Sequence, residues 1–268
     1  MISDNQMPSQ FRAVIDDQLT VYNSGRSIQV VNDIPDTSQI PIHDQTHWLR
    51  IPDVICVYVD MMGSTKLSAE SHDRSTAGAY QLYTGTAVRL FHEFDAPYID
   101  VRGDGVFALF NGNQAYTALA AAVTFKTFAK EVFVPKIRDG SRIDVGSHIG
   151  IDQKTVLVRK LGLRRSGGRT DRQNEVWAGK PVNMAAKLAS ISSDDELLAS
   201  GRFFGRLKDD HALLTCGCPD GIRTQLWTSK DLGQDSRFDF DIAYRLTSVW
   251  CKKHGAEFCD AILELDRC

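Results

Sequence analysis

The sequence has no long apolar run and no strong excess of charge of either sign. Its 268 residues carry a formal net charge of −3, and no stretch approaches the roughly 20 consecutive apolar residues that cross a bilayer. This charge balance does not favour nucleic acid as a partner, and the polar, acidic start of the chain lacks the apolar segment of a signal peptide. We therefore expect a cytoplasmic protein with neither nucleic-acid nor membrane partners.

The sequence also lacks internal repeats, low-complexity tracts and a dense set of cysteines. Its six cysteines are scattered, and in a reducing compartment we expect no disulfide framework. Cys216 and Cys218 form one Cys-x-Cys pair with no matching second pair or histidine cluster, so we expect no structural zinc there. A chain of this length can bury a core without such cross-links.

Three segments differ in pattern along the chain. Residues 1–50 combine a short helix over residues 9–22 with an irregular stretch that contains prolines. We interpret them as an N-terminal extension that packs on the main domain or on a second subunit. Residues 51–230 alternate strand and helix patterns and form the main domain. Residues 231–268 are predicted to be a helical C-terminal extension, because the apolar residues over 237–265 have a helical spacing.

The main domain predicts an α/β (α+β) fold with a ferredoxin-like βαββαβ core. The expected elements are a strand over 53–60, a helix over 66–94, a hairpin over 97–110, a helix over 114–132 stopped by Pro135, a strand over 142–152 continued over 155–161, a turn over 178–181 that opens a helix, and short strands over 196–200 and 212–216 around a helix over 201–207. Residues 159–172 are strongly basic. They predict either a solvated loop or an arm near a subunit interface or a polyphosphate.

Two aspartates lie at positions that this fold brings close together, the end of the first strand and the turn of the hairpin. Asp60 closes the first strand, and Asp104 stands between Gly103 and Gly105 at the hairpin turn. A ferredoxin-like unit places the end of its first strand beside this turn. Two adjacent carboxylates repel each other unless a cation lies between them, and oxygen ligands favour Mg²⁺ or Mn²⁺. The simpler alternative is that both are ordinary turn residues.

Two further groups of residues suit a phosphate ligand. Gly63, Ser64 and Thr65 precede a helix, where free N–H groups and the helix dipole favour phosphate. Asn183 and Lys187 are four residues apart on a later helix, so both side chains leave the same side of it. With the aspartates, these groups predict a two-metal phosphoryl-transfer site. Alternatively, Ser64 or Thr65 is an N-cap and the Asn183–Lys187 pair is simply exposed.

In order and spacing, the three motifs resemble the catalytic domain of the class III nucleotidyl cyclases. They are Asp60-x-x-Gly63-Ser64-Thr65, Arg102-Gly103-Asp104-Gly105 and Gly179-Lys180-Pro181-Val182-Asn183-x-Ala185-Ala186-Lys187, and the resemblance covers about residues 53–200. It implies a homodimer with active sites at the subunit interface and two Mg²⁺ or Mn²⁺ ions per site. One subunit would supply Asp60, Met61 and Asp104 to the metals, and the other would supply Asn183 and Lys187. Lys187 departs from the family's arginine and loses the bidentate contact to the α-phosphate.

Base choice in the similar purine cyclases depends on two positions, which here are Tyr98 and Val176. Neither the lysine and aspartate of adenylate cyclases nor the glutamate and small polar residue of guanylate cyclases are present. The tyrosine resembles that of bacterial pyrimidine cyclases of the Pycsar antiphage systems. This resemblance implies conversion of UTP to 3′,5′-cyclic UMP and pyrophosphate, and a separate effector protein that binds the product. Glu175 and Trp177 are neighbours that could also touch the base.

Other functions remain open from the sequence alone. The same fold could act on CTP or ATP. A cyclase-like domain that only binds nucleotide is favoured by Lys187 and by the lack of a clear second phosphate-binding lysine, since neither Lys208 nor Lys230 can be aligned. The paired aspartates oppose this alternative. A diguanylate synthase is disfavoured, because its Gly-Gly-acidic-acidic hairpin is missing.

Overall fold

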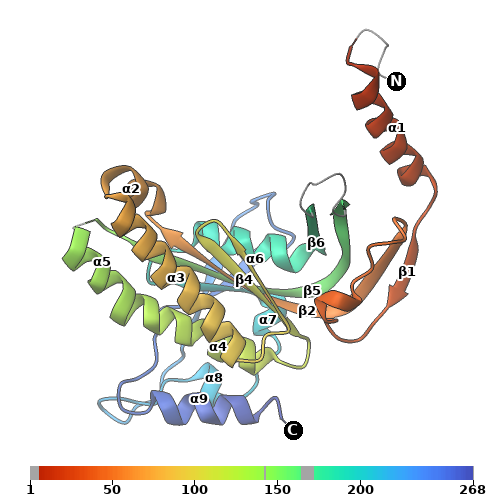
Figure 1. Ribbon diagram of the computed structural model, residues 1–268. Coiled ribbons are helices and arrows are strands. Elements are labelled where there is room, and N and C mark those ends of the chain that lie inside the picture. Colours follow the sequence, from red (N-terminus) through yellow and green to blue (C-terminus); the bar gives the residue numbers. More distant parts are fainter. Residues whose placement is uncertain (1–5, 142, 164–171, 268) are drawn as a thin grey trace.

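The computed structural model describes residues 6–141, 143–163 and 172–267 of the chain. Within them, nine strands form one sheet whose main path runs β3-β4-β2-β5-β7-β9-β8, while β1 pairs with β2 and β6 pairs with β5 (Figure 1). The strands are β1 (Ser27–Val30), β2 (His47–Met62), β3 (Tyr98–Arg102), β4 (Gly105–Asn111), β5 (Gly146–Leu163), β6 (Arg172–Gly179), β7 (Leu197–Ser200), β8 (Trp227–Asp231) and β9 (Ile242–Leu246). The helices are α1 (Ser9–Asn23), α2 (Ser64–Glu70), α3 (Asp73–Glu93), α4 (Ala115–Phe128), α5 (Val134–Ser141), α6 (Lys180–Ile191), α7 (Gly201–Phe204), α8 (Asp210–Leu213) and α9 (Gly255–Glu264), with short turns η1 (Thr37–Gln39) and η2 (Ala129–Phe133).

The ferredoxin-like core predicted from the sequence is confirmed. Strand β2 is followed by α3, the β3–β4 hairpin, α4 and β5, and the four strands lie in the order β3-β4-β2-β5. The apolar run of β2 is central because it is buried on both sides, with Val54 and Val57 both fully buried.

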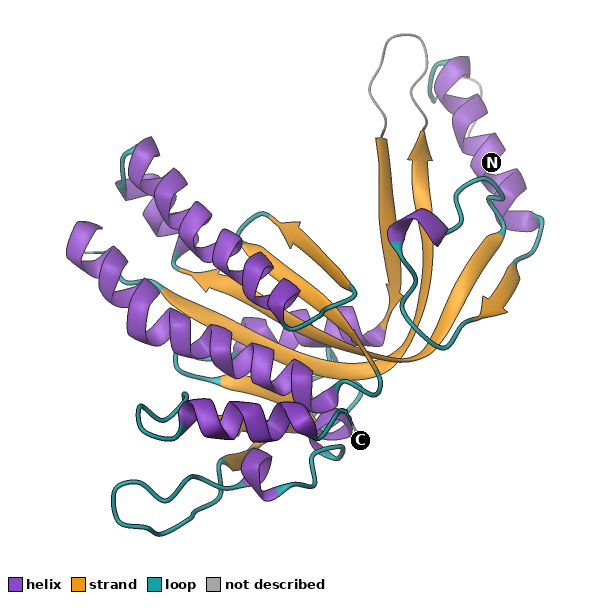
Figure 2. Ribbon diagram, turned by 60° about the horizontal axis from the view of Figure 1, so that its bottom comes forward, coloured by secondary structure: helices purple, strands orange, loops and turns teal. Residues whose placement is uncertain are grey.

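Helices cover the two faces of the sheet differently. On one face, α3 lies beside the continuous helical run of α4, η2 and α5 (Figure 2), and β2 packs there through Ile55, Val57 and Val59. The opposite face carries Cys56 and Tyr58 of β2 together with α6, which packs against it through Ala185. Residue 150 of β5 is a glycine, and a Cβ atom there would lie only 2.7 Å from the backbone nitrogen of Ala189 on α6. The missing side chain therefore lets α6 pack closely against β5.

The N-terminal segment is only partly an extension. The predicted helix is confirmed as α1, which projects from the rest of the chain and buries none of its residues (Figure 1). Ile34 and Ile40 do pack into the core of the α6 face. The strand predicted over 53–60 is β2 and begins at His47, because the register shift between Ile51 and Val54 lets the strand pass Pro52.

Two helix predictions are wrong in their boundaries. The helix expected over 66–94 is two helices, because Ser71 and His72 have extended backbones and α3 starts anew at Asp73. Pro135 does not end the helical run that begins with α4. The chain passes through the five-residue π-type turn η2 and continues as α5, which begins at Val134. The wider turn accommodates the ring and the missing N–H of the proline.

The strand expected over 142–152 with a continuation is confirmed as the single 18-residue strand β5. It pairs with β6, and Figure 2 shows the two strands leaving the helix-covered part of the molecule together. The sequence predicts only a turn before α6 and does not predict strand β6. The centre of the basic segment, residues 164–171, lies outside the described residues.

The C-terminal part differs most from prediction. Residues 212–216 do not form a strand; they include the end of the short helix α8 and an isolated bridge from Leu214 to Gln225. The helical prediction over 237–265 is wrong in its first half, which holds β9, and correct in its second half, which holds α9. Because β9 lies between β7 and β8, the sheet extends beyond residue 230. In the described parts of the chain, no helix is both long and apolar enough to cross a membrane.

Candidate active site

Asp60 and the turn that carries Asp104 lie together, as the sequence predicts. Asp60 is near the end of β2, and Arg102 pairs with Gly105 across the hairpin, so Gly103 and Asp104 form its two-residue turn. A Cβ atom at residue 105 would lie 2.8 Å from Oδ1 of Asp60. The absence of a side chain at Gly105 therefore lets the Asp60 carboxylate approach the hairpin.

The local electrostatics fit a divalent cation. Burial and then the negative charge of Asp104 raise the pKa of Asp60 to about 6, and His148 offsets part of this effect. Burial, followed by the charges of the same two aspartates, raises the pKa of Tyr58 to about 12. A half-buried Asp60 whose ionisation is disfavoured by burial and by the neighbouring Asp104 charge forms, with Asp104, an oxygen donor set suited to Mg²⁺ or Mn²⁺.

The chain turns directly from Asp60 into the candidate phosphate loop. Gly63 caps α2 with a left-handed φ of 81°, and a Cβ atom there would lie 2.6 Å from the carbonyl oxygen of Asp144. Ser64 and Thr65 are the first two residues of α2. The conformation of the loop therefore depends on Gly63, because a residue with a side chain would be strained at this φ and would clash with Asp144. Met61 is 2 % exposed and its side chain packs in the core, so it offers only its backbone carbonyl to the site.

Tyr98 lies at the start of β3 among residues of β6. Its ring centroid is 4.6 Å from that of Trp177, and its hydroxyl donates a hydrogen bond of 3.5 Å to Glu175. Burial raises the pKa of Tyr98 to about 12, so its hydroxyl stays protonated. Val176 lies between Glu175 and Trp177 on β6, and its side chain faces the opposite side of the strand. The structure therefore joins Tyr98 to Glu175 and Trp177 rather than to Val176.

Asn183 and Lys187 lie on α6, as predicted. Asn183 is exposed, and the Lys187 ammonium donates to the backbone carbonyl of Arg237 at 2.7 Å. Of the two lysines considered as further phosphate ligands, Lys230 donates to Glu196 and to the carbonyl of Ile191 at 3.1 Å each. Lys208 is exposed, and its backbone N–H binds the hydroxyl of Tyr116 on α4.

Sequence reasoning missed an ion-pair network that holds the chain over α6. Arg202 makes a bidentate contact of 2.7 and 2.6 Å to the fully buried Asp152 and a second contact of 2.9 Å to Asp239. Asp239 also accepts from Lys180, the first residue of α6, at 2.7 Å. These partners are 37 or more residues apart in the sequence, so no local sequence pattern predicts the ion pairs.

The metal-binding and base-contacting candidates lie on the same face of the sheet. Tyr98 pairs with Leu109, which pairs with Cys56, and Asp60 is four residues farther along β2. At a rise of about 3.3 Å per residue, the two groups are separated by about 13 Å along the strand. Both face the side on which α6 lies, because residues 56, 58 and 60 alternate with the core-facing residues 55, 57 and 59.

No family model matches the chain. A curated uridylate cyclase of Propioniciclava tarda is 38% identical over 229 residues, which are 84% of this chain and 73% of that protein. A uridylate cyclase of Micromonospora echinofusca is 36% identical over 235 residues, which are 85% of this chain and 75% of that protein.

Solved structures with the same fold are cyclase domains of low sequence identity. The adenylyl cyclase CyaB from P. aeruginosa superposes with a TM-score of 0.61 and 16% identity, covering 76% of this chain and 97% of that one. The guanylyl cyclase Cya2 gives 0.57 and 17%, covering 75% and 93%. The guanylate cyclase domain of RhGC from Catenaria anguillulae, in complex with GTP, gives 0.58 and 14%, covering 75% and 98%.

These structures establish the cyclase fold. The curated relatives share more than a third of their aligned residues with this chain over most of its length. The chain therefore belongs to the family of the uridylate cyclases.

Proposed function

We propose that the protein converts UTP to 3′,5′-cyclic UMP and pyrophosphate. The observation that carries this proposal is the approach of Asp60 to the Asp104 turn in a chain 38% identical to a uridylate cyclase. In the reaction, the ribose 3′-oxygen bonds to the α-phosphorus, the bond from that phosphorus to the bridging oxygen breaks, and the 3′-hydroxyl proton is released. The products are the cyclic monophosphate and pyrophosphate.

Asp60 and Asp104, with the backbone carbonyl of Met61, would hold two Mg²⁺ or Mn²⁺ ions. When bound, these ions acidify the 3′-hydroxyl and neutralise the charge that develops on pyrophosphate. The mutual repulsion of the two carboxylates supports this assignment, because it makes the site favourable for a cation before any nucleotide arrives.

The other site residues position the nucleotide. Backbone N–H groups at Gly63, Ser64 and Thr65 would bind the phosphates at the start of α2. Asn183 of a second copy would orient the ribose. Lys187 of that copy would stabilise charge on the α-phosphate as a single ammonium, after it releases the Arg237 carbonyl. The metal-binding and the base-contacting candidates lie on the same face of the sheet. This arrangement supports a homodimer with two sites at its interface.

Tyr98, Glu175 and Trp177 would recognise the base. The Trp177 and Tyr98 rings offer an apolar wall, and Glu175 accepts hydrogen bonds beside the Lys160 ammonium, 3.5 Å away. An acceptor next to a donor matches the N3–H and O4 of uracil. It also matches the amino group and N3 of cytosine, so CTP is the second candidate substrate.

We propose further that the product is a second messenger in antiphage defence, made in the cytoplasm and bound by a separate effector protein. This role rests on the resemblance to the antiphage pyrimidine cyclases.

Product analysis tests the function directly. The purified protein is incubated with Mg²⁺ or Mn²⁺ and each of ATP, GTP, CTP and UTP, and products are identified by mass. Cyclic UMP should dominate, and Asp60→Asn and Asp104→Asn should each lower its rate by about 100-fold or more. Asp95→Asn is the matched control, since Asp95 is exposed beyond the far end of the hairpin and its φ of 52° suits asparagine. Dominant cyclic AMP or cyclic GMP would contradict the proposed substrate. Absence of product with all four, together with unchanged nucleotide binding in the aspartate variants, would contradict the proposed site.

A further inference from the structure

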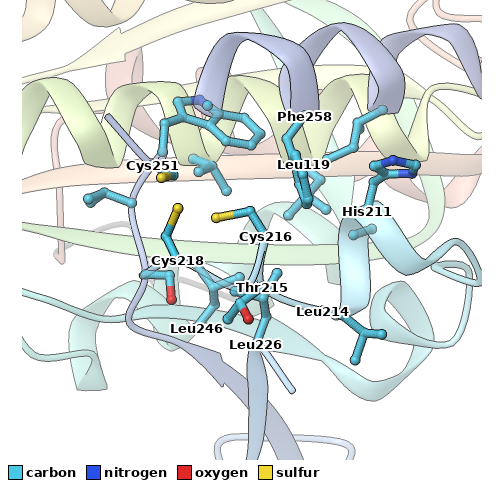
Figure 3. Close-up of a pocket in the computed structure, with 17 residues that line it drawn as sticks. Leu119, His211, Leu214, Thr215, Cys216, Cys218, Leu226, Leu246, Cys251 and Phe258 are labelled. Atoms are coloured by element: carbon cyan, nitrogen blue, oxygen red, sulfur yellow. The ribbon is translucent and has the colours of Figure 1, made fainter. Parts of the chain in front are cut away.

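Three cysteines and a histidine converge in the C-terminal part of the chain, in segments separate from the site described above. The Sγ atoms of Cys216, Cys218 and Cys251 and a ring nitrogen of His254 all lie within 4.8 Å of one another. Figure 3 shows the three sulfur atoms turned toward the same point. Sγ of Cys218 is 3.2 Å from Nδ1 of His254.

Each pair of ligand residues is held by its own backbone turn. Gly217 takes a left-handed φ of 84°, and its carbonyl accepts from the N–H of Gly221 at 2.6 Å, which fixes Cys216 and Cys218 at the start of a tight turn. The second pair stands at the start of α9, where the carbonyl of Cys251 accepts from the N–H of Gly255 at 2.7 Å. The backbone N–H groups of Lys253 and His254 donate to the Cys251 sulfur, as outer-shell donors to a metal-bound thiolate do.

We propose that Cys216, Cys218, Cys251 and His254 form a structural zinc site. Three sulfurs and one imidazole nitrogen are a donor set typical of Zn²⁺ and unlike the all-oxygen set at Asp60 and Asp104. A tetrahedral ion with Zn–S bonds of about 2.3 Å and a Zn–N bond of about 2.0 Å places its ligand atoms about 3.5–3.8 Å apart. The four atoms lie within 4.8 Å of one another, with Sγ of Cys218 and Nδ1 of His254 3.2 Å apart, so small side-chain shifts would bring them to this geometry. With four protein ligands the ion would have no open position, so its role is structural rather than catalytic.

Such an ion would link two segments that already contact each other through the rings of His211 and Phe258. One is the loop that leads to β8, and the other is the start of α9, which lies beside α4 (Figure 1). Hydrogen bonds already attach the same segment to α4: Trp250 donates to Thr124 at 2.8 Å, and Asp266 accepts from the N–H groups of Tyr116 and Thr117 at the start of α4. The ion would thus complete the attachment of residues 250–267 to the outer helical layer.

The expectation that Cys216 and Cys218 lack a matching pair is therefore wrong. The second pair has the zinc-compatible spacing Cys-x-x-His, but it lies 33 residues downstream of Cys218. The β8–β9 hairpin reverses the chain between the two pairs and returns the second to the first. Only the fold shows that they meet.

Metal analysis of the full chain, purified without chelator, tests the site. Elemental mass spectrometry should find about one zinc per chain in the wild type and less than about a tenth of that in Cys218→Ser and in Cys251→Ser. Cys259→Ser is the matched control, because Cys259 lies on α9 outside the cluster and this variant should keep its zinc. Chelation should lower the Tm of the wild type and of the control.

A second measurement does not depend on the folding of any variant. Wild-type protein reconstituted with Co²⁺ should show the visible absorption of tetrahedral cobalt and thiolate-to-cobalt charge transfer. Zinc that persists in both cysteine variants, a wild type that binds neither zinc nor cobalt in this form, or a disulfide among the three cysteines detected by mass would each overturn the proposal. None of these readouts depends on cyclase activity.

Discussion

At the scale of single residues, one glycine shapes the candidate metal site and another shapes the candidate phosphate loop. Gly105 leaves room for the Asp60 carboxylate, and Gly63 fits a left-handed turn against the carbonyl of Asp144. Neither could be assigned this role from the sequence, because a glycine in a turn satisfies many backbone requirements. The aspartates themselves could be predicted, since a strand end and a hairpin tip are local features.

Base recognition is only partly visible in the sequence. The position of Tyr98 relative to Asp104 singles it out in the sequence, whereas Glu175 and Trp177 stand out only as neighbours of Val176. Their importance depends on β6 being a strand, because alternation along that strand turns Glu175 and Trp177 toward Tyr98 and turns Val176 away.

Tyr98→Phe tests the base pocket. The change removes the hydroxyl that donates to Glu175 and keeps the ring against Trp177. We expect kcat/KM for UTP to fall by about 10-fold, as for the loss of one hydrogen bond, while Tm stays close to that of the wild type. Steady-state kinetics with UTP and CTP measure the effect. Tyr80→Phe on α3 is the control, because its hydroxyl makes only a 3.4 Å contact to Ser68. Wild-type kinetics in Tyr98→Phe for every nucleotide would contradict a role of the hydroxyl.

At the scale of elements, the position of α6 depends on its contact with β5. Gly150→Ala would place a methyl group against the backbone of Ala185 and 2.7 Å from the nitrogen of Ala189. We expect the free energy of unfolding to fall by about 1–3 kcal/mol, because backbone cannot move aside as a side chain does. The activity should fall as well, since α6 carries Asn183 and Lys187.

Urea unfolding of Gly150→Ala and Gly140→Ala compares a packed with an open position. Gly140 lies in α5 with no heavy atom within 4 Å of the added methyl group, so its substitution should leave the stability unchanged or raise it by up to about 1 kcal/mol. Equal stabilities of the two variants would show that α6 does not press on β5 in solution.

Elements with local causes could be predicted, and those that depend on distant partners could not. The β3–β4 hairpin and the first helix follow from alternation, turn residues and helical spacing in their own segments. The sequence predicts a helix at β9 because its apolar residues fit both periods, whereas pairing with β7 and β8 makes the segment a strand. Pro135 predicts a helix stop, because the π-type turn that accommodates it leaves no local signal in the sequence.

At the scale of the whole molecule, the proposed homodimer divides each active site between two chains. Asp104→Ala would inactivate the metal half of a site, and Asn183→Ala would inactivate the half supplied by the other copy. Mixing the two variants at equal concentration should restore about a quarter of the wild-type activity, because half of the dimers are mixed and each holds one intact site.

Product formation after subunit exchange measures this recovery. Mixtures of Asp60→Ala with Asp104→Ala are the control, since both changes fall in the same half and should restore nothing. Recovery in neither mixture, with subunit exchange demonstrated by labelled chains, would mean that one chain supplies a complete site.

The place of β9 between β7 and β8 has a consequence for biosynthesis. While the chain leaves the ribosome, β7 has its β5 partner, but its other edge stays unpaired until Leu246 has emerged. An open edge of the apolar residues Leu197, Leu198 and Ala199 is a template for pairing with other nascent chains. Pairing of β9 with β7 would therefore cover an edge that could otherwise aggregate in the newly made protein, and early termination in this region would leave that edge exposed.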